Sequence, residues 1–209
     1  MDTRSRRRTL SGAILLAACV SSVLLLRGFS TPYAPSAPDY RTHGPADAPV
    51  QLAEFSDFQC PGCSASVEPL KRLQALYPGK IRFVFKHMPW PFHPSARKAA
   101  VAAECAGRTG GRFWDFHDAL YARQAEWVKP EDGPSAFLRY AGEFGLDKKA
   151  FAACLEDPTA VAAVDADVKE AKERWVRSTP TFFVNGARFV GNKQLRTLAL
   201  NRIEDILKR

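Results

Sequence analysis

Cys60 and Cys63 are the residues with the clearest capacity for chemistry, in the stretch FSDFQCPGCSASVEPLKRL (residues 55–73). Such a pair can exchange disulfides, supply half of a zinc site or form a structural cross-link. Cys60 stands where a strand-like run becomes a helix-like run, which predicts a place at a helix N-terminus. Free backbone N–H groups and the helix dipole favour an anion there and lower the pKa of a thiol. This position favours a redox pair, with Cys63 one turn further along and able to resolve a mixed disulfide.

The two alternatives find less support in the rest of the chain. A zinc site needs further ligands at short spacing, but Cys105 and Cys154 are far apart and the four histidines show no H-x3-H pattern. A purely structural Cys60–Cys63 bond would close a very small loop and remove little entropy from the unfolded chain. We therefore expect thiol–disulfide chemistry, which needs no metal and no organic cofactor.

The elements that would hold the pair form a βαβ unit. Residues 50–58 (VQLAEFSDF) are apolar and β-prone, and residues 81–88 (IRFVFKHM) are rich in β-branched and aromatic side chains. Between them, residues 63–77 carry apolar side chains at helical spacing, with Pro69 expected to kink the helix. Strand, helix and strand with short links predict two parallel strands.

The second half of the chain adds a helical block and a hairpin. From about residue 94 to 177 the pattern is helical throughout. TPTFFVNGARFVG then gives strand, Asn185-Gly186 and strand, the strongest short-range hairpin signal, and residues 192–208 end the chain as a helix. The fold class is thus α/β, in the order β-α-β, helical insertion, β-β-α.

In these segments the chain resembles DsbA-like thiol-disulfide oxidoreductases, from about residue 47 to 208. The resemblance is to thioredoxin-fold proteins with a helical insertion, in the extracytoplasmic branch with a CPxC motif and a second cysteine pair. The matching segments, in the same order, are EFSDFQCPGC, KHMPW with HPSARKAA, CAGRTGGRFWDFHDALY, FAACLED and STPTFFVNG.

The resemblance implies specific roles. Cys60 would be the exposed attacking cysteine and Cys63 the buried resolving one. Thr179 and Pro180 would form a loop with a cis peptide bond packed against the disulfide, where the Thr179 backbone could pair with a substrate strand. The alternative is an ordinary trans proline opening a strand. Cys105–Cys154 would be a structural disulfide, worth about 3–4 kcal/mol in the chain-entropy model; two buried free thiols are the alternative.

Other ionisable residues allow two interpretations each. Glu54 matches a buried acid of the family that could move protons to and from Cys63, or it is a solvated strand residue. Lys86 is a possible partner for Glu54, although a surface lysine is the simpler interpretation. His117 is expected to be a packed or capping residue. His87 and Trp90 follow the second strand and could border the site.

The N-terminal residues point outside the cytoplasm. Residues 1–30 combine a basic head with the uncharged run 10–26, as in an export signal or a membrane anchor. SRRRTL loosely resembles a twin-arginine signal, and LAAC a lipobox that would lipidate Cys19. Residues 31–46 are rich in Pro, Ala and Ser and predict an extended tether before a thioredoxin-like domain at 47–209.

Together these observations predict an extracytoplasmic enzyme, in the periplasm or on the outer face of the membrane, that introduces disulfides into exported proteins. Its partners would be reduced or misfolded exported proteins and a membrane protein that resets the cysteine pair. The net charge is +8, but no basic stripe interleaved with aromatics is present, so nucleic acid is not expected. A reductase or isomerase of the same fold, or a non-redox chaperone module, remains the alternative.

Overall fold

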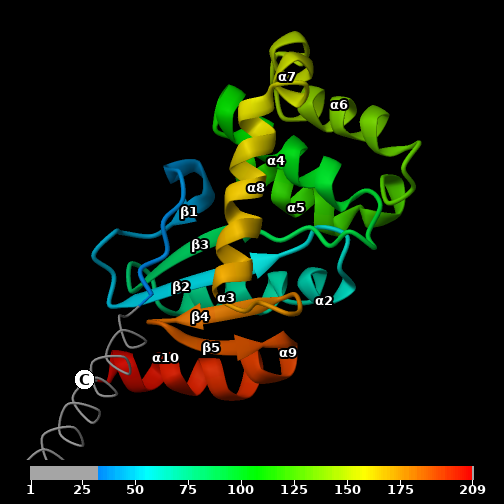
Figure 1. Ribbon diagram of the computed structural model, residues 1–209. Helices are drawn as coiled ribbons and strands as arrows, with labels where there is room; N and C mark the ends of the chain where they lie inside the picture. Colours follow the sequence, from blue (N-terminus) through cyan, green and yellow to red (C-terminus); the bar gives the residue numbers. More distant parts are fainter. Residues whose placement is uncertain (1–32, 209) are drawn as a thin grey trace, which may run out of the picture. The chain divides into compact units, whose positions relative to one another are not determined.

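A five-stranded mixed sheet forms the centre of the computed structural model, which describes residues 33–208 (Figure 1). Strands β2 and β3 run parallel, and the other pairings are antiparallel, in the order β1-β3-β2-β4-β5. The predicted α/β class and element order are confirmed. The strands are β1 (Thr42–His43), β2 (Val50–Ser56), β3 (Ile81–His87), β4 (Thr181–Val184) and β5 (Ala187–Val190).

The crossover between β2 and β3 consists of two helices, α2 (Pro61–Ser64) and α3 (Val67–Leu76). Pro69 lies in the first turn of α3. It has no N–H to donate to the carbonyl of Ala65, and its ring would clash with that group in a continuous helix. The break at residues 65 and 66 therefore separates the short helix that carries the cysteines from the longer one that packs on the sheet.

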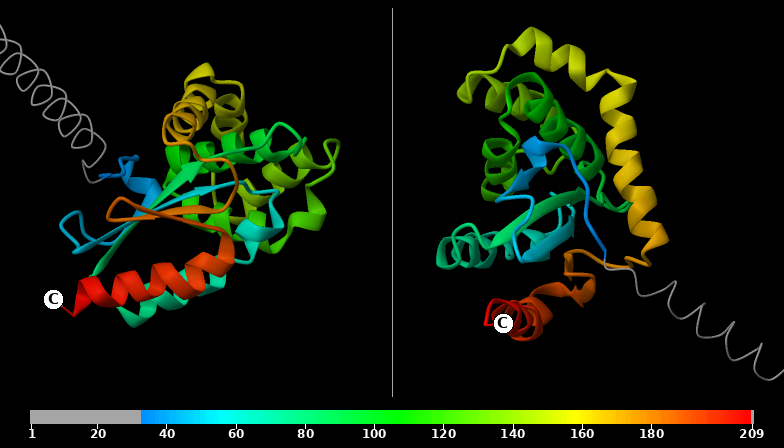
Figure 2. Two further views of the ribbon diagram at one scale, coloured as in Figure 1. Left: turned by 60° about the horizontal axis from the view of Figure 1, so that its bottom comes forward. Right: turned by 90° about the vertical axis from the view of Figure 1, so that its left-hand side faces the viewer.

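Each face of the sheet has its own cover. On one face, α3, the π-helical turn η3 (Leu195–Ala199) and α10 (Leu200–Leu207) enclose an apolar core with the strands. The opposite face is covered by α8 (Pro158–Glu173), so the sheet lies between α8 and the α3–α10 layer (Figure 2, right). The β4–β5 hairpin turns at Asn185 and Gly186, both with positive φ, as the Asn-Gly pair predicts.

The helical insertion lies between β3 and β4. It packs around α4, whose alanines are almost all buried against α5 and the neighbouring helices. Asp147 and Asp157 accept hydrogen bonds from backbone N–H groups in the first turns of α7 and α8. The insertion consists of α4 (Ala96–Gly110), α5 (Phe113–Ala122), η2 (Gln124–Glu126), α6 (Gly133–Glu143), α7 (Lys148–Leu155) and α8.

The segment before β2 differs from the prediction. Residues 31–46 were expected as an extended tether, but η1 (Asp39–Arg41) and β1 belong to the folded unit. Tyr40 lies on α4 where Gly107 leaves room, since a Cβ there would come within 2.3 Å of the ring. Arg41 is buried and pairs with Glu104 and Asp167. A two-residue strand has too short a pattern to reveal itself in a Pro-rich segment.

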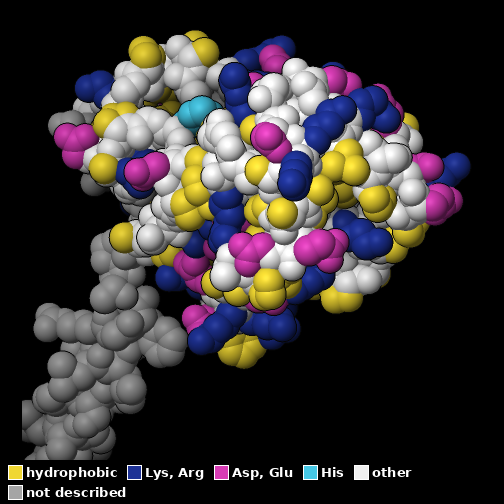
Figure 3. All heavy atoms as spheres, turned by 90° about the horizontal axis from the view of Figure 1, so that it is seen from above, with side chains coloured by type: hydrophobic (Ala, Val, Ile, Leu, Met, Phe, Trp, Pro, Cys, Tyr) yellow, Lys and Arg dark blue, Asp and Glu magenta, His cyan; other side chains and the backbone are white. Residues whose placement is uncertain are grey.

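The export signal or anchor expected over residues 1–30, with Cys19 and the run 10–26, lies outside the described residues. Within residues 33–208, no helix is both long and apolar enough to cross a membrane. Over the face seen in Figure 3, Lys and Arg are interspersed with Asp and Glu rather than gathered by sign.

Candidate redox site

The cysteine motif lies at the turn from β2 into α2. Cys60 is the N-cap of α2 and is half-buried, whereas Cys63 is fully buried; both are free thiols. Pro61 occupies the first helical position, where its missing N–H needs no partner. The Cys60 carbonyl accepts hydrogen bonds from Cys63 N at 3.1 Å and Ser64 N at 3.1 Å. One sulfur is thus presented towards the surface and the other is enclosed.

The Thr179–Pro180 loop lies against this motif, and its peptide bond is cis. The Cys60 thiol donates to the Thr179 carbonyl across 3.5 Å. Gly62 also touches the loop, because a Cβ there would lie 3.3 Å from Pro180 Cδ. The Asn192 amide donates to the Gly62 carbonyl at 2.7 Å, so the short helix α9 (Gly191–Gln194), which follows the hairpin, also holds the motif.

The two thiols have opposite proton affinities. The neighbouring Cys63 thiol, the Thr179 side chain and the N–H groups of Gly62 and Cys63 lower the pKa of Cys60 from 9.0 to about 5, although partial burial opposes them. Burial, the proximity of Cys60 and the Glu54 carboxyl raise the pKa of Cys63 well above its ordinary value. Cys60 is therefore a thiolate at neutral pH while Cys63 keeps its proton, as an attacking and a resolving cysteine require.

Glu54 lies beneath the motif on β2 and is only 2% exposed. Its Oε1 accepts hydrogen bonds from Ser56 Oγ at 3.0 Å and Ser66 Oγ at 2.9 Å. Burial raises the pKa of Glu54 from 4.5 to about 7, and the two serines partly oppose the shift. A carboxyl with this pKa can both bind and release a proton near neutral pH.

Lys86 is not the partner of Glu54, and it is not a surface lysine either. It is buried, with Nζ 2.9 Å from Asp167 Oδ1 and 2.8 Å from Glu170 Oε2. Glu54 is opposite Phe85 in the β2–β3 register, whereas Lys86 is opposite the next residue of β2. Because side chains alternate along a strand, Lys86 points to the face covered by α8 and Glu54 to the other.

Of the two residues expected to border the site, Trp90 does so, and His87, the last residue of β3, does not. The Trp90 indole Nε1 donates to Thr179 Oγ1 at 3.1 Å. His87 is fully buried, and its Nε2 lies 3.5 Å from Glu104 Oε2. Residues that the sequence did not single out are Asp57 and Asn192. The signal for Asp57 in the sequence was weak: an acid between a strand and Cys60, three residues before that cysteine.

The second cysteine pair is a disulfide. Cys105 in α4 and Cys154 in α7 are bonded, with Cα atoms 5.7 Å apart and a sequence separation of 49. Cys105 is fully buried within the helical core. The bond ties two helices of the insertion together and takes no part in the Cys60 site.

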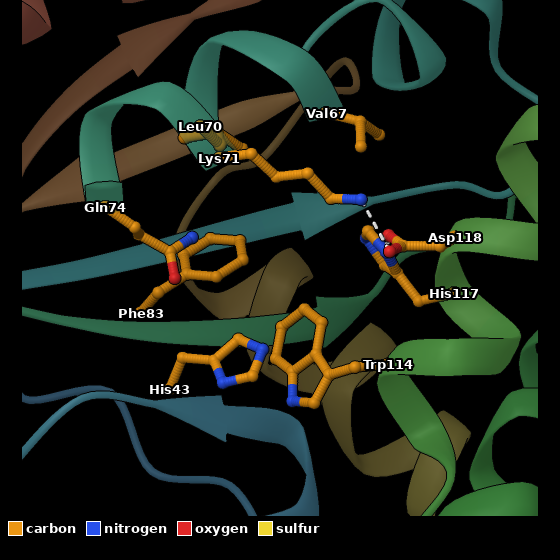
Figure 4. Close-up of a pocket in the computed structure, with 9 residues that line it drawn as sticks. All are labelled: His43, Val67, Leu70, Lys71, Gln74, Phe83, Trp114, His117 and Asp118. Atoms are coloured by element: carbon orange, nitrogen blue, oxygen red, sulfur yellow. Dashed lines mark hydrogen bonds and ion pairs between the residues drawn. The ribbon is translucent and has the colours of Figure 1, made fainter. Parts of the chain in front are cut away.

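A small cavity of about 80 Å³ lies between α3 and α5 and contains neither redox cysteine (Figure 4). Lys71 crosses its mouth to Asp118 at 2.5 Å, and Asp118 also lies 3.0 Å from His117 Nδ1. His117 is buried among aromatic rings, so it packs there and does not face Cys60. Within residues 33–208, no three His, Cys, Asp or Glu side chains are grouped to hold a metal ion.

Comparison with known sequences identifies the family. The sequence model described as thioredoxin matches residues 36–201, most of the chain. The chain belongs to the thioredoxin family. With its helical insertion and second cysteine pair it has the DsbA-like form of the fold.

Curated relatives share the domain but are longer proteins. "Na(+)/H(+) antiporter NhaA 3" of Salinispora tropica is 39% identical over 157 residues, which cover 75% of this chain and 23% of that protein. "Na(+)/H(+) antiporter NhaA" of Herminiimonas arsenicoxydans is 34% identical over 155 residues, covering 74% and 24%. The chain thus spans about a quarter of the length of the curated relatives it matches. The ion transport in their names refers to those longer proteins.

Solved structures match nearly the whole fold. BdbD from Bacillus subtilis, in its oxidised form, is 25% identical with a TM-score of 0.73, covering 86% of this chain and 98% of that one. A thioredoxin-like oxidoreductase from Silicibacter pomeroyi is 26% identical with a TM-score of 0.64, covering 81% and 99%. DsbA2 from Pseudomonas aeruginosa, at 24% identity and a TM-score of 0.64 over 79% and 95%, shows the same fold.

Proposed function

We propose that the protein is an extracytoplasmic thiol-disulfide oxidoreductase that introduces disulfides into exported proteins through Cys60 and Cys63. The observation that carries the proposal is the asymmetry of the pair. A half-exposed sulfur with a pKa of about 5 lies beside a buried one whose pKa is raised. A structural cross-link or a non-redox module has no use for such an asymmetry.

The proposed reaction begins with the Cys60–Cys63 disulfide. A substrate thiolate attacks Cys60 Sγ, a substrate–Cys60 bond forms, and Cys63 leaves with the bonding electrons and takes up a proton. A second substrate thiolate then attacks its own sulfur in the mixed disulfide, and Cys60 leaves as the stable thiolate. The substrate has lost two electrons and two thiol protons, and the enzyme pair has gained the electrons.

Glu54 is the proposed proton donor and acceptor for Cys63. It is buried below the pair, its charge acts on the Cys63 thiol, and its pKa of about 7 suits transfer in either direction. Thr179 and Pro180 complete the site. The Thr179 backbone is proposed to hold the substrate chain next to Cys60 in an extended form.

The low pKa of Cys60 supports the proposed direction of electron flow. Pro61 and Gly62 supply no charge to it, yet the Cys63 thiol and the backbone groups lower its pKa. Stabilising the thiolate stabilises the reduced enzyme, which makes the disulfide a stronger oxidant. This favours donation of disulfides over reduction.

The apolar surface beside the site suits a polypeptide substrate. Phe92 is 71% exposed and stacks on Trp90 with ring centroids 5.5 Å apart. Trp90 is in turn bonded to Thr179. Large exposed aromatics next to a reactive group are typical of surfaces that bind other chains.

Location and redox partner belong to the same proposal. The Cys105–Cys154 disulfide suits an oxidising compartment, and the sequence of residues 1–30 suits export or anchoring. Each turnover leaves Cys60 and Cys63 reduced, so a membrane redox protein that accepts their two electrons must reset them.

The test is the oxidation of a reduced, unfolded protein that holds several cysteines. The oxidised wild-type protein should form disulfides in it stoichiometrically. C60S should form none. C63S, mixed with the oxidised form of the same substrate protein, should accumulate a mixed disulfide visible by mass spectrometry, because the Cys60 thiolate attacks a substrate disulfide and no second thiol of the enzyme releases it. If neither C60S nor the wild type forms disulfides in the substrate and both suppress its aggregation equally, the protein is a chaperone and not an oxidoreductase.

A further inference from the structure

Asp57, between β2 and the cysteine motif, has a carboxylate that is fully buried and fully bonded. Its side chain is 0% exposed. Oδ1 accepts from Gln59 N at 2.7 Å, Oδ2 accepts from Trp90 N at 2.8 Å, and the same Oδ2 lies 2.8 Å from His93 Nδ1. A buried carboxylate is costly unless it is paired and hydrogen-bonded in this way. The group therefore fixes the donors around it, two of which lie in the segment after β3.

The main chain of Asp57 contacts the two cysteines. Its N–H donates to Cys63 Sγ at 3.4 Å, and its carbonyl accepts from Cys60 N at 3.0 Å. One residue thus holds the motif with its backbone and the segment from Trp90 to His93 with its side chain.

Trp90 connects Asp57 to the Thr179 loop, which lies against Cys60. Its backbone N–H is held by Asp57, while its indole Nε1 donates to Thr179 Oγ1 at 3.1 Å. The carbonyl of Thr179 accepts from Cys60 Sγ across 3.5 Å. The contacts therefore run from Cys60 to Asp57, on to Trp90 and Thr179, and back to Cys60. These contacts join three separate parts of the chain: residues 57–60, Trp90 and Thr179.

We propose that Asp57 is a positioning residue for thiol–disulfide exchange: by holding Trp90 against Thr179, it fixes the Thr179 loop beside the Cys60 sulfur. This proposal rests on the exchange function proposed above. Asp57 touches no substrate atom and transfers no proton. It acts through Trp90, whose backbone N–H donates to the Asp57 carboxylate and whose indole N–H donates to Thr179. An error of about 1 Å in such a loop can cost two orders of magnitude in rate.

The experiment compares variants of the full chain by two measurements. The first is kcat/KM for oxidation of a peptide with two cysteines. The second is the fluorine NMR spectrum of protein labelled with fluorotryptophan, in which W90F identifies the Trp90 signal among the four tryptophans. The variants are D57N, which keeps the size but cannot accept from all three donors, and W90F, which keeps the ring but loses the bond to Thr179. D165N, an exposed aspartate of α8, is the matched control.

D57N and W90F should each lower kcat/KM about tenfold or more, and the double variant should be no worse than the poorer single one because both break the same connection. D57N should also shift the Trp90 fluorine signal. H93Q, which keeps a donor for Oδ2, should retain most of the activity, whereas H93A should not. D165N should match the wild type in both measurements.

Wild-type kcat/KM and an unmoved Trp90 signal in folded D57N would overturn the proposal, and so would additive losses in the double variant. If D57N does not fold, kcat/KM of W90F and of H93A tests the proposal instead. Wild-type values of kcat/KM in both variants would then overturn the proposal. If the wild-type protein does not oxidise the peptide, the proposed function fails. The fluorine signal still tests whether Asp57 holds Trp90.

Discussion

The Cys60 sulfur lies 3.5 Å from the carbonyl oxygen of Thr179, the residue before the cis proline. These residues are separated by the whole helical insertion in sequence, and the β2–β4 pairing brings them together. The contact places the attacking sulfur beside the loop proposed to hold the substrate backbone. It explains why the motif and the loop form one site although they lie far apart in sequence.

The titration of Cys60 is the first prediction. Its thiolate absorbance in the reduced protein should persist on acidification until about pH 5, because the Cys63 thiol and the backbone groups lower its pKa. Relative to the unfolded chain, the reduced fold should gain stability as pH rises from about 5 to 9, since the thiolate forms earlier in the folded state. C63A removes the leading cause and should raise the Cys60 pKa. An unchanged titration in C63A would contradict this assignment.

Glu54 should make the protein less stable at alkaline pH. Its pKa is about 7 when folded against 4.5 ordinarily, so between these values the folded state holds the proton that the unfolded chain has lost. The contribution of Glu54 to the free energy of unfolding should therefore fall as pH rises through this window, by about 3 kcal/mol for the full shift, against the rise that comes from Cys60. Urea unfolding across pH should show a smaller fall in E54Q. Identical pH profiles for the two proteins would rule Glu54 out as the cause.

E54Q should also slow the release of Cys63. Without the carboxyl, the proton on Cys63 must be exchanged with solvent at a buried site, so the step that forms the mixed disulfide should slow by about tenfold or more. The loss should grow as pH falls below about 7, where the wild-type Glu54 is protonated and can donate. Stopped-flow mixing of the oxidised variant with a cysteine peptide measures the rate of mixed-disulfide formation at each pH. A pH-independent loss would indicate a packing effect.

Loss of the Cys105–Cys154 disulfide should reduce stability and leave the chemistry intact. The bond closes a loop across 49 residues of sequence, so the C105A/C154A protein should lose about 3–4 kcal/mol of unfolding free energy in the chain-entropy model. Its rate of peptide oxidation at a temperature where it is folded should remain within about twofold of wild type. A collapse of the rate in a folded variant would place the bond in the reaction.

Arg41 should contribute far more to the stability of the fold than a residue of an extended tether would. It is 3% exposed and pairs with Glu104 and Asp167. R41A would remove one buried cation from this network, leaving Arg108 for Glu104 and Lys86 for Asp167. Breaking such a pair costs about 3–5 kcal/mol. Chemical denaturation of R41A against R72A, an exposed arginine paired only within its own helix, provides the comparison. Equal stabilities would mean that residues 39–43 are not part of the cooperative unit.

Periodicity and turn chemistry predicted most of the fold. The apolar runs gave β2 and β3, Asn185-Gly186 gave the hairpin, and the helical insertion lies between β3 and β4 as expected. β1 was missed because two residues cannot show alternation. The suggested pairing of Lys86 with Glu54 was wrong, because the strand register decides which face of the sheet a side chain takes. The register is set by pairing between strands that are distant in sequence.

The sequence predicted the site residues whose chemistry follows from residue type alone. It did not predict those whose role depends on tertiary contacts. Cys60 and Cys63 were evident from spacing and position at a helix start. The burial of Glu54 required the sheet and α3 to be in place. The links from Asp57 to Trp90 and from Trp90 to Thr179 join three separate segments, and no local pattern specifies them.

The central claim is that the Cys60–Cys63 disulfide is a strong oxidant, and its equilibrium with glutathione tests that claim most directly. The protein is equilibrated over a range of reduced and oxidised glutathione, alkylated, and the two redox states are counted by mass spectrometry. A reduction potential of roughly −120 to −180 mV is the predicted result, because the Cys60 thiolate stabilises the reduced form. A value near about −270 mV would contradict the account and make the protein a thioredoxin-like reductant.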